Sequence, residues 1–252
     1  MDITVEAISV DDISPLRESY RREMNCQIIH DSLHSRAGWT QPYLLSAGGE
    51  TVGYGAVAIG GPWQGKPTIF EFYILPEHRS RIFEIFEAYL AASEAVAIET
   101  QTNDVLLTVM LHTYANDVTS EKILFHDKAT TALAIPNAVF RPAVPDDAAQ
   151  LSAHEMDPHA NWVVTLDGSL AAAGGILFHY NPPYGDIFMK VAEPFRRRGL
   201  GAYLVQELKK VCYEGGHVPA ARCNTDNFAS RRTLQKAGFE PCGHILRGSL
   251  RP

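Results

Sequence analysis

The segment from Val191 to Gly201, VAEPFRRRGLG, constrains the fold of this chain more than any other stretch. An apolar run leads into it, and in residues 202–214 behind it apolar positions recur at the three- and four-residue spacing of a one-sided helix. The backbone N–H groups at a helix start are unpaired and bind anions. Gly199 and Gly201 let a phosphate approach the backbone, and Arg196–Arg198 add positive charge. We therefore predict a strand, a diphosphate-binding turn and a helix in succession.

The two halves of the chain repeat one order of signals. Each has an Asp-Asp helix start, at Asp11 and at Asp146, then a Gly-Gly or Asp-Gly hairpin signal, then a strand, an arginine and a helix. We expect a duplicated domain, with one copy in residues 1–136 and the other in residues 137–252. Strands are expected at residues 43–46, 51–59, 68–75 and 104–113 in the first half, and at 162–166, 169–178, 186–192 and 218–224 in the second.

The charge of the chain limits its partners. The net charge of −7 argues against a general binder of nucleic acid or of anionic membranes. Residues 1–136 hold 9 Lys+Arg and 18 Asp+Glu, whereas residues 137–252 hold 13 and 11, so a polyanionic small ligand favours the second half. No apolar run approaches the roughly 18–20 residues of a membrane span, and no secretory signal is visible. We expect a cytoplasmic protein with reduced cysteines.

Two motifs occur in order in the second half. Arg196-Arg197-Arg198-Gly199-Leu200-Gly201 fits the pattern Arg/Gln-x-x-Gly-x-Gly/Ala, and Asn227-Phe228-Ala229-Ser230 precedes a helical stretch that ends at Gly238-Phe239. Through these motifs, residues 139–250 resemble the GNAT superfamily of acyl-CoA-dependent N-acyltransferases, and the first half resembles it through the repeat. The resemblance implies an α/β (α+β) protein with two GNAT-like domains, the N-terminal copy degenerate. Each domain would be a mixed, mostly antiparallel sheet flanked by helices.

The resemblance also implies a site for acetyl-CoA as cosubstrate. In the family, pantetheine pairs with the fourth strand where the sheet splays, and the amides of the glycine turn hold the diphosphate. Asn227 also suits a helix N-cap, which is compatible with a ligand contact. The positions that match the family's binding residues are Met189, Val191, Ala192, Arg196, Arg197, Arg198, Gly199, Leu200, Gly201, Ala202, Asn227 and Ser230.

The activity that the resemblance implies is direct transfer of an acetyl group to a primary amine of a small molecule or peptide. A base must deprotonate the acceptor, and Glu193 and Asp186 flank the fourth strand as candidates, although each also fits a solvated or turn-capping carboxylate. Leu234 stands where the family often has a tyrosine that protonates the leaving thiolate. A non-catalytic acyl-CoA-binding or sensing protein is therefore the alternative. A structural heterodimerising module that binds no CoA is a third.

The first half departs from the binding motif. Aligning Arg79 with Arg196 places Ile82 and Glu84 where the two glycines of the turn stand. Their side chains would block a phosphate, and the carboxylate would repel it. We expect this half to keep the fold without binding CoA, and to shape the acceptor site instead.

Two groups of histidines superficially resemble metal ligands. The segment His154–His159 lacks the H-E-x-x-H spacing and contains Pro158, so we expect a loop. His30 and His34 lie four residues apart on an expected helix without a third ligand, which favours a surface or packing role. No metal is expected.

Overall fold

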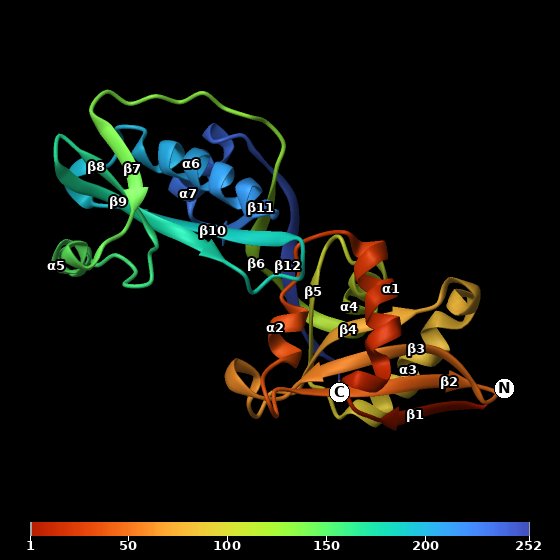
Figure 1. The fold of residues 1–252 in the computed structure, drawn as a ribbon. Helices are drawn as coiled ribbons and strands as arrows, with labels where there is room; N and C mark the ends of the chain where they lie inside the picture. The colour runs from red at the N-terminus through yellow and green to blue at the C-terminus, as the bar shows by residue number, and fades with distance from the viewer. Residues whose placement is uncertain (1, 252) are drawn as a thin grey trace. The chain divides into compact units, whose positions relative to one another are not determined.

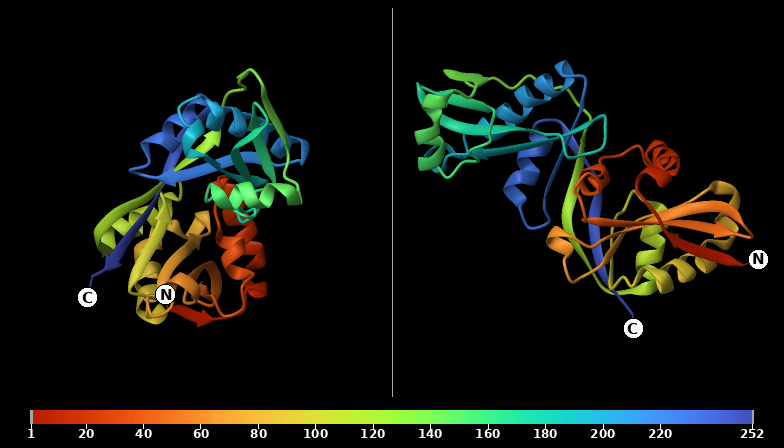
Figure 2. Two further views of the ribbon diagram at one scale, coloured as in Figure 1. Left: turned by 90° about the vertical axis from the view of Figure 1, so that its left-hand side faces the viewer. Right: turned by 60° about the horizontal axis from the view of Figure 1, so that its bottom comes forward.

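The computed structural model describes residues 2–251 and divides the chain into two compact units. Unit 1 contains the chain up to Lys122 and again from Gly243 on, and unit 2 contains Ile123–Cys242. These bounds differ from the division at residue 136 that the sequence suggested. The reason is that two long strands, β6 (Ala115–Asp127) and β12 (Phe239–Leu250), each give one end to each unit (Figures 1 and 2).

Both units follow the same order of elements along the chain. In unit 1 the order is β1–α1–β2–β3–β4–α3–β5–α4–β6, with the short α2 added after α1, and in unit 2 it is β7–α5–β8–β9–β10–α6–β11–α7–β12. The added α2 stands between α1 and β2, whereas no helix separates α5 from β8 in unit 2. Each unit is a mostly antiparallel sheet with helices packed on it, which confirms the predicted fold class.

Unit 1 is built on the strand order β1-β2-β3-β4-β5. All neighbours are antiparallel except β4 and β5, which pair in parallel only at Thr68↔Ala97 and Ile69↔Ile98. The C-terminal part of β12 then pairs with β5 from Ile245↔Gln101 to Ser249↔Ala97, so the end of the chain completes this sheet. The elements are β1 (Ile3–Ala7), α1 (Ser14–Met24), α2 (His30–His34), β2 (Thr40–Ala47), β3 (Glu50–Ala58), β4 (Thr68–Ile74), α3 (Ile82–Ser93), β5 (Ala97–Gln101) and α4 (Val105–Tyr114).

The strand expected at residues 104–113 is wrong, because this stretch forms the helix α4. Its short apolar run contains valines and resembles a buried strand. However, the Asp104 carboxylate accepts a hydrogen bond from Leu107 N at 3.0 Å and so caps the start of a helix. Leu107, Met110 and Leu111 are buried at helical spacing in the core of unit 1.

Unit 2 has the strand order β11-β10-β9-β8-β7, with β6 on the other side of β11. The strands from β7 to β10 are antiparallel neighbours, and β10 is parallel to β11. The elements are β7 (Ala138–Pro142), α5 (Ala148–Ala153), β8 (Trp162–Leu166), β9 (Ser169–Leu177), β10 (Tyr184–Val191), α6 (Leu200–Glu214), β11 (Val218–Asn224) and α7 (Phe228–Lys236).

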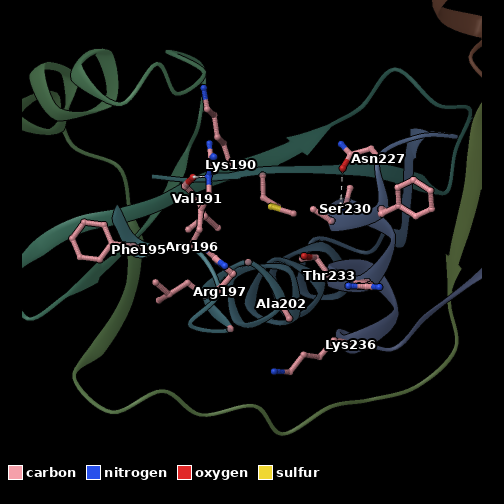
Figure 3. A pocket seen from close by; sticks show the side chains of 17 residues that line it. Lys190, Val191, Phe195, Arg196, Arg197, Ala202, Asn227, Ser230, Thr233 and Lys236 are labelled. Atoms are coloured by element: carbon pink, nitrogen blue, oxygen red, sulfur yellow. Dashed lines mark hydrogen bonds between the residues drawn. The ribbon is translucent and has the colours of Figure 1, made fainter. Parts of the chain in front are cut away.

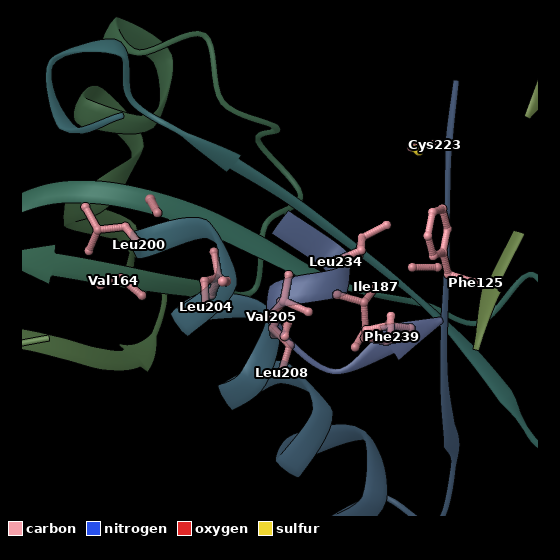
Figure 4. Close-up of a cluster of buried hydrophobic side chains, with 14 of the residues drawn as sticks. Phe125, Val164, Ile187, Leu200, Leu204, Val205, Leu208, Cys223, Leu234 and Phe239 are labelled. Carbon is pink, nitrogen blue, oxygen red and sulfur yellow. The ribbon is translucent and has the colours of Figure 1, made fainter. Parts of the chain in front are cut away.

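The core of unit 2 lies between its sheet and α6 (Figure 4). Leu200, Leu204, Leu208 and Cys212 are buried on one face of α6, as their spacing predicted. Val205 is buried too, whereas Tyr203 and Val211 are only partly buried. A second, smaller core forms around α5 and contains Leu151, Val163 and Ala173. Gly216 adopts a left-handed conformation with φ +76° after α6, as glycines often do just past the end of a helix.

Candidate functional site

A cavity of unit 2 lies where the end of β10, the glycine turn, the start of α6 and one face of α7 meet (Figure 3). Its volume is about 820 Å³. Residues of all three segments that the sequence singled out line it. They are Met189, Lys190, Val191, Phe195, Arg196, Arg197, Gly199, Leu200, Gly201, Ala202, Asn227, Phe228, Ala229, Ser230, Arg232, Thr233 and Lys236.

The turn needs its two glycines for different reasons. Gly199 has a φ of +84°, in the left-handed region that side chains disfavour, and the space around it holds no atom closer than 3.6 Å to an added Cβ. Gly201 lies inside α6, where an added Cβ would be 3.1 Å from Thr233 Cγ2 and 3.4 Å from Val191 Cγ2. Gly199 therefore sets the path of the chain into α6. Gly201 keeps the floor of the cavity open between β10 and α7.

The start of α6 provides backbone donors and positive charge. Gly199 makes no side-chain cap, so the first N–H groups of α6 face the turn without an intrahelical acceptor. Arg196, Arg197, Arg232 and Lys236 line the same cavity. Such a combination of helix amides and cations binds phosphate groups.

The strands β10 and β11 separate close to the cavity. They pair only at Tyr184↔Val218, Gly185↔Pro219 and Asp186↔Ala220, although both strands continue. Beyond Asp186, the edge of β10 that faces β11 therefore lacks a ladder partner. An extended ligand can add to such an edge by hydrogen bonds to the backbone, and Met189–Val191 at the far end of this edge line the cavity.

Asn227 caps α7 and also lines the cavity. Its side chain accepts a hydrogen bond from Ser230 N at 3.0 Å, as Figure 3 shows, so its predicted capping role is confirmed. The cap directs the N-terminal turn of α7, including Ala229 and Ser230, toward the cavity. The contact of Asn227 with CoA stays a prediction. The position of the residue beside the cavity is compatible with it.

Four of the predicted site residues do not line the cavity. Ala192 is buried in the smaller core, and Arg198 is exposed with its guanidinium 5.7 Å from the centroid of the Phe195 ring. Glu193 is exposed in the short 3-10 turn after β10. Asp186 is buried, and its Oδ2 lies 2.8 Å from His179 Nε2 and 3.3 Å from Arg222 Nε. Neither carboxylate is thus a free group beside the cavity.

Several lining residues on α7 were missed from the sequence. Ala229, Arg232, Thr233 and Lys236 recur at spacings of three and four after Asn227 and so share one helix face. This periodicity could have identified them once Asn227 was placed beside the ligand. Lys190, Phe195 and Phe228 also line the cavity and had no comparable signal.

Unit 1 keeps the backbone geometry of this region but not its charge. Arg79 Nε donates to Ile74 O at 2.9 Å, and Arg196 Nε donates to Val191 O at 3.4 Å, which supports the alignment of the two arginines. In unit 1, however, Arg79 Nη2 is bound to Glu23 at 2.7 Å. Glu23 thus neutralises the Arg79 guanidinium, whereas the aligned Arg196 lines the cavity of unit 2.

Aromatic side chains fill the region of unit 1 that corresponds to the cavity. Phe72, which aligns with Met189, is fully buried with its ring centroid 4.8 Å from Phe86 and 6.1 Å from Tyr89. Glu84, aligned with Gly201, lies in the first turn of α3 and binds Arg81. These features are compatible with the expectation that unit 1 does not bind CoA, which stays a prediction.

The histidine groups behave differently from one another. Residues 154–161 form no helix, which confirms the expected loop. His30 and His34 are in packing positions, and both contact the buried Glu71. Within residues 2–251, no group of three or more His, Cys, Asp or Glu side chains is placed to hold a metal ion. None of the helices in these residues is long and apolar enough to cross a membrane.

A splayed sheet beside a glycine turn and a helix N-terminus defines the class of GNAT acyltransferases. The model of the acetyltransferase (GNAT) family matches residues 130–239, which contain the turn, α6 and α7. The matched residues therefore form a GNAT domain, and unit 1 repeats the order of elements of unit 2.

Solved structures share the fold over the whole chain. A GNAT-family acetyltransferase from Colwellia psychrerythraea has a TM-score of 0.74 at 14% identity and covers 98% of this chain and 100% of its own. A tandem GNAT protein from the clavulanic acid biosynthesis pathway has a TM-score of 0.64 at 13% identity and covers 100% of this chain and 99% of its own. A GCN5-related N-acetyltransferase from Sphaerobacter thermophilus has a TM-score of 0.61 at 16% identity and covers 99% of this chain and 96% of its own. No curated protein sequence is significantly similar to the chain.

Proposed function

We propose that this protein transfers an acetyl group from acetyl-CoA to a primary amine, using one site in unit 2. The observation that supports this proposal is the cavity between the splayed strand β10, the left-handed Gly199 turn and α7. It combines phosphate-binding donors at one end with an unpaired strand edge at the other. An acyl-CoA has the matching order of groups, with a diphosphate at one end of its pantetheine arm and a thioester at the other.

The residues that would hold acyl-CoA follow from this order. The amides at the start of α6 and the cations Arg196 and Arg197 would bind the diphosphate. The edge of β10 near Met189 and Val191 would pair with the pantetheine arm. When bound, acyl-CoA supplies an activated thioester carbonyl, which the amine attacks without a covalent enzyme intermediate. A Cβ at Gly201 would take up space that the arm needs between β10 and α7.

The leaving thiolate has no acid at the family's usual position. Leu234 is buried in the core of unit 2, and its side chain cannot donate a proton. A thiol of ordinary pKa, about 8.5, is a good leaving group, so the thiolate can depart and take its proton from water. The absence of a tyrosine at this position is therefore compatible with transfer.

Thiol release tests the proposal. Acetyl-CoA and a panel of primary amines that includes amino acids, polyamines and aminoglycosides should give release with at least one amine, and calorimetry should give one CoA bound per chain. Binding of CoA without release on any amine would favour the alternative, a binding or sensing protein. Two CoA molecules per chain would contradict the loss of the site in unit 1. No binding at all would contradict both readings.

A further inference from the structure

A histidine, an aspartate and an arginine form a cluster in unit 2 that the proposed site does not use. His179 lies in the connection between β9 and β10, Asp186 on β10 and Arg222 on β11. The Asp186 side chain is 7% exposed, whereas those of His179 and Arg222 are 23% and 25% exposed. The buried carboxylate thus holds two side chains that reach solvent.

The contacts of His179 indicate which of its nitrogens carries the proton. Nε2 lies 2.8 Å from Asp186 Oδ2, and Arg222 Nη2 lies 3.4 Å from the same nitrogen. A carboxylate only accepts and a guanidinium only donates, so the two neighbours favour opposite tautomers. The carboxylate contact is shorter by 0.6 Å and places the hydrogen on Nε2. Nδ1 then holds the lone pair and can accept a proton. Arg222 Nε, 3.3 Å from Oδ2, balances the charge of the carboxylate.

The cluster lies at the point where β10 and β11 separate. Asp186 is the last residue of β10 that pairs with β11. Side chains alternate along a strand, and Ile187 and Met189 face the core and cavity on the α6 side, so Asp186 faces the other side of the sheet. Met189 is three residues, or about 10 Å, further along the strand. A thioester whose diphosphate is held at the turn would extend from Met189 toward this point.

We propose that His179 is the catalytic base of the transfer reaction and that Asp186 and Arg222 position it; this inference rests on the proposed function. His179 Nδ1 takes a proton from the acceptor ammonium. The freed amine lone pair attacks the thioester carbonyl carbon, the C–N bond forms and the C–S bond breaks. CoA leaves as a thiolate and takes up the second proton that the nitrogen loses as the amide forms, and His179 returns its own proton to water. The amine would enter from the sheet face opposite α6, which the cofactor leaves free.

His179→Gln tests the assignment, because the side chain is partly exposed and its replacement leaves the Asp186–Arg222 pair intact. With the best amine of the panel, kcat should fall about 100-fold or more, a typical contribution of a general base, while the KM for acetyl-CoA changes less than twofold. The ionisation that controls the wild-type pH profile of kcat/KM should disappear. With hydroxylamine as the acceptor, which is largely unprotonated at neutral pH, the rate of His179→Gln should fall much less. His126→Gln changes another partly buried histidine of unit 2, outside the cluster, and should retain wild-type rates.

Other titratable groups near His179 also bear on the pH profile of kcat/KM. Besides Asp186 and Arg222, the Tyr180 ring lies edge-on to the imidazole at 4.8 Å between centroids. Burial, and then the charge of Asp186, raise the pKa of Tyr180 well above its ordinary value, so it stays neutral in the assay range. Cys242 on β12 acts electrostatically on Tyr180.

Asp186→Asn provides a second variant. An asparagine amide would donate to Nε2 and move the imidazole proton to Nδ1, so the variant should be as impaired as His179→Gln, and the double variant no worse than either. CoA binding by calorimetry should stay within twofold in each. If the wild type is active and His179→Gln keeps the same rate and pH profile, the assignment of His179 is overturned, whereas the proposed function stands. A wild type that releases thiol with no amine would overturn the proposed function and this inference with it.

Discussion

In unit 1, His34 Nε2 lies 2.9 Å from Glu71 Oε2, and both side chains are buried. The other carboxylate oxygen, Oε1, is 2.9 Å from His30 Nδ1, and Arg17 Nε is 3.7 Å from Oε2. A short helix, α2, and the sheet strand β4 are thus joined through one carboxylate. The helix has only five residues and could not be stable alone, so its position depends on this contact.

Replacing Glu71 by Gln should therefore destabilise unit 1. We expect the free energy of unfolding to fall by about 3 kcal/mol, because the change leaves the buried Arg17 guanidinium less compensated. Urea unfolding followed by tryptophan fluorescence measures the change. Glu84→Gln, which breaks an exposed pair with Arg81, should cost less than about 1 kcal/mol. Equal losses for the two variants would show that the network does not stabilise the fold.

The same carboxylate predicts a loss of stability in acid. Burial alone would raise the pKa of Glu71, but the charge of His30 and hydrogen bonds from His30 and His34 hold it well below its ordinary value. A depressed folded-state pKa stabilises the fold above the unfolded pKa of about 4.3, and this stabilisation is lost as the pH falls further. Wild type should therefore lose more stability below pH 4 than Glu71→Gln does. Parallel curves would contradict the assignment.

Asp104 should have the opposite pH dependence. Burial raises its pKa to about 6, against hydrogen bonds from Leu107 N and Tyr20 Oη that lower it. The folded state then binds more protons than the unfolded state between pH 4 and 6, so the free energy of unfolding falls as the pH rises through this range, by about 2–3 kcal/mol. Asp104→Asn keeps a helix cap and should lack this slope. Urea unfolding at pH 4, 5, 6 and 7 compares the two; equal slopes would contradict the buried carboxylate.

Lys209 should be essential for the stability of unit 2. It is buried in α6, with Nζ 2.6 Å from Asp127 Oδ1, 2.7 Å from Ala129 O and 2.8 Å from Ala237 O. Lys209→Met leaves the buried carboxylate without its cation and should cost about 3 kcal/mol in thermal or urea unfolding. The adjacent Lys210 is exposed and pairs with Glu207, so Lys210→Met should cost less than about 1 kcal/mol. A small effect at Lys209 would show that solvent replaces its contacts.

Two left-handed glycines lie at opposite ends of α6. Comparing the same substitution at each distinguishes the effect of backbone strain from the effect on ligand binding. Gly199 and Gly216 have φ of +84° and +76°, and neither has an atom within 3.5 Å of an added Cβ. Gly199→Glu and Gly216→Glu should each lose about 1–2 kcal/mol of stability through backbone strain. Only Gly199→Glu should weaken CoA binding, by tenfold or more, because it brings a negative charge to the cavity. Equal CoA affinities in calorimetry would place the cofactor elsewhere.

The strand-turn-helix around Gly199, the helix α6 and the cap at Asn227 could be predicted because their signals are local. A glycine at a left-handed position, a three- and four-residue spacing and a capping side chain each act within a few residues. Residues 104–113 show the limit of this reasoning. Their apolar run fits a strand or a helix equally, and only the Asp104 cap and burial of Leu107, Met110 and Leu111 select the helix.

The sequence by itself determined the place of the glycine turn, the repeat and the absence of the two glycines from the aligned turn of the first half. Only the tertiary structure decided that the end of β12 completes the sheet of unit 1, that Glu71 joins His30 and His34, and that Asp186 holds His179 and Arg222. These partners lie between 7 and 152 residues apart. No short-range spacing rule connects them, because strand pairing and buried ion pairs are selected by packing of the whole unit.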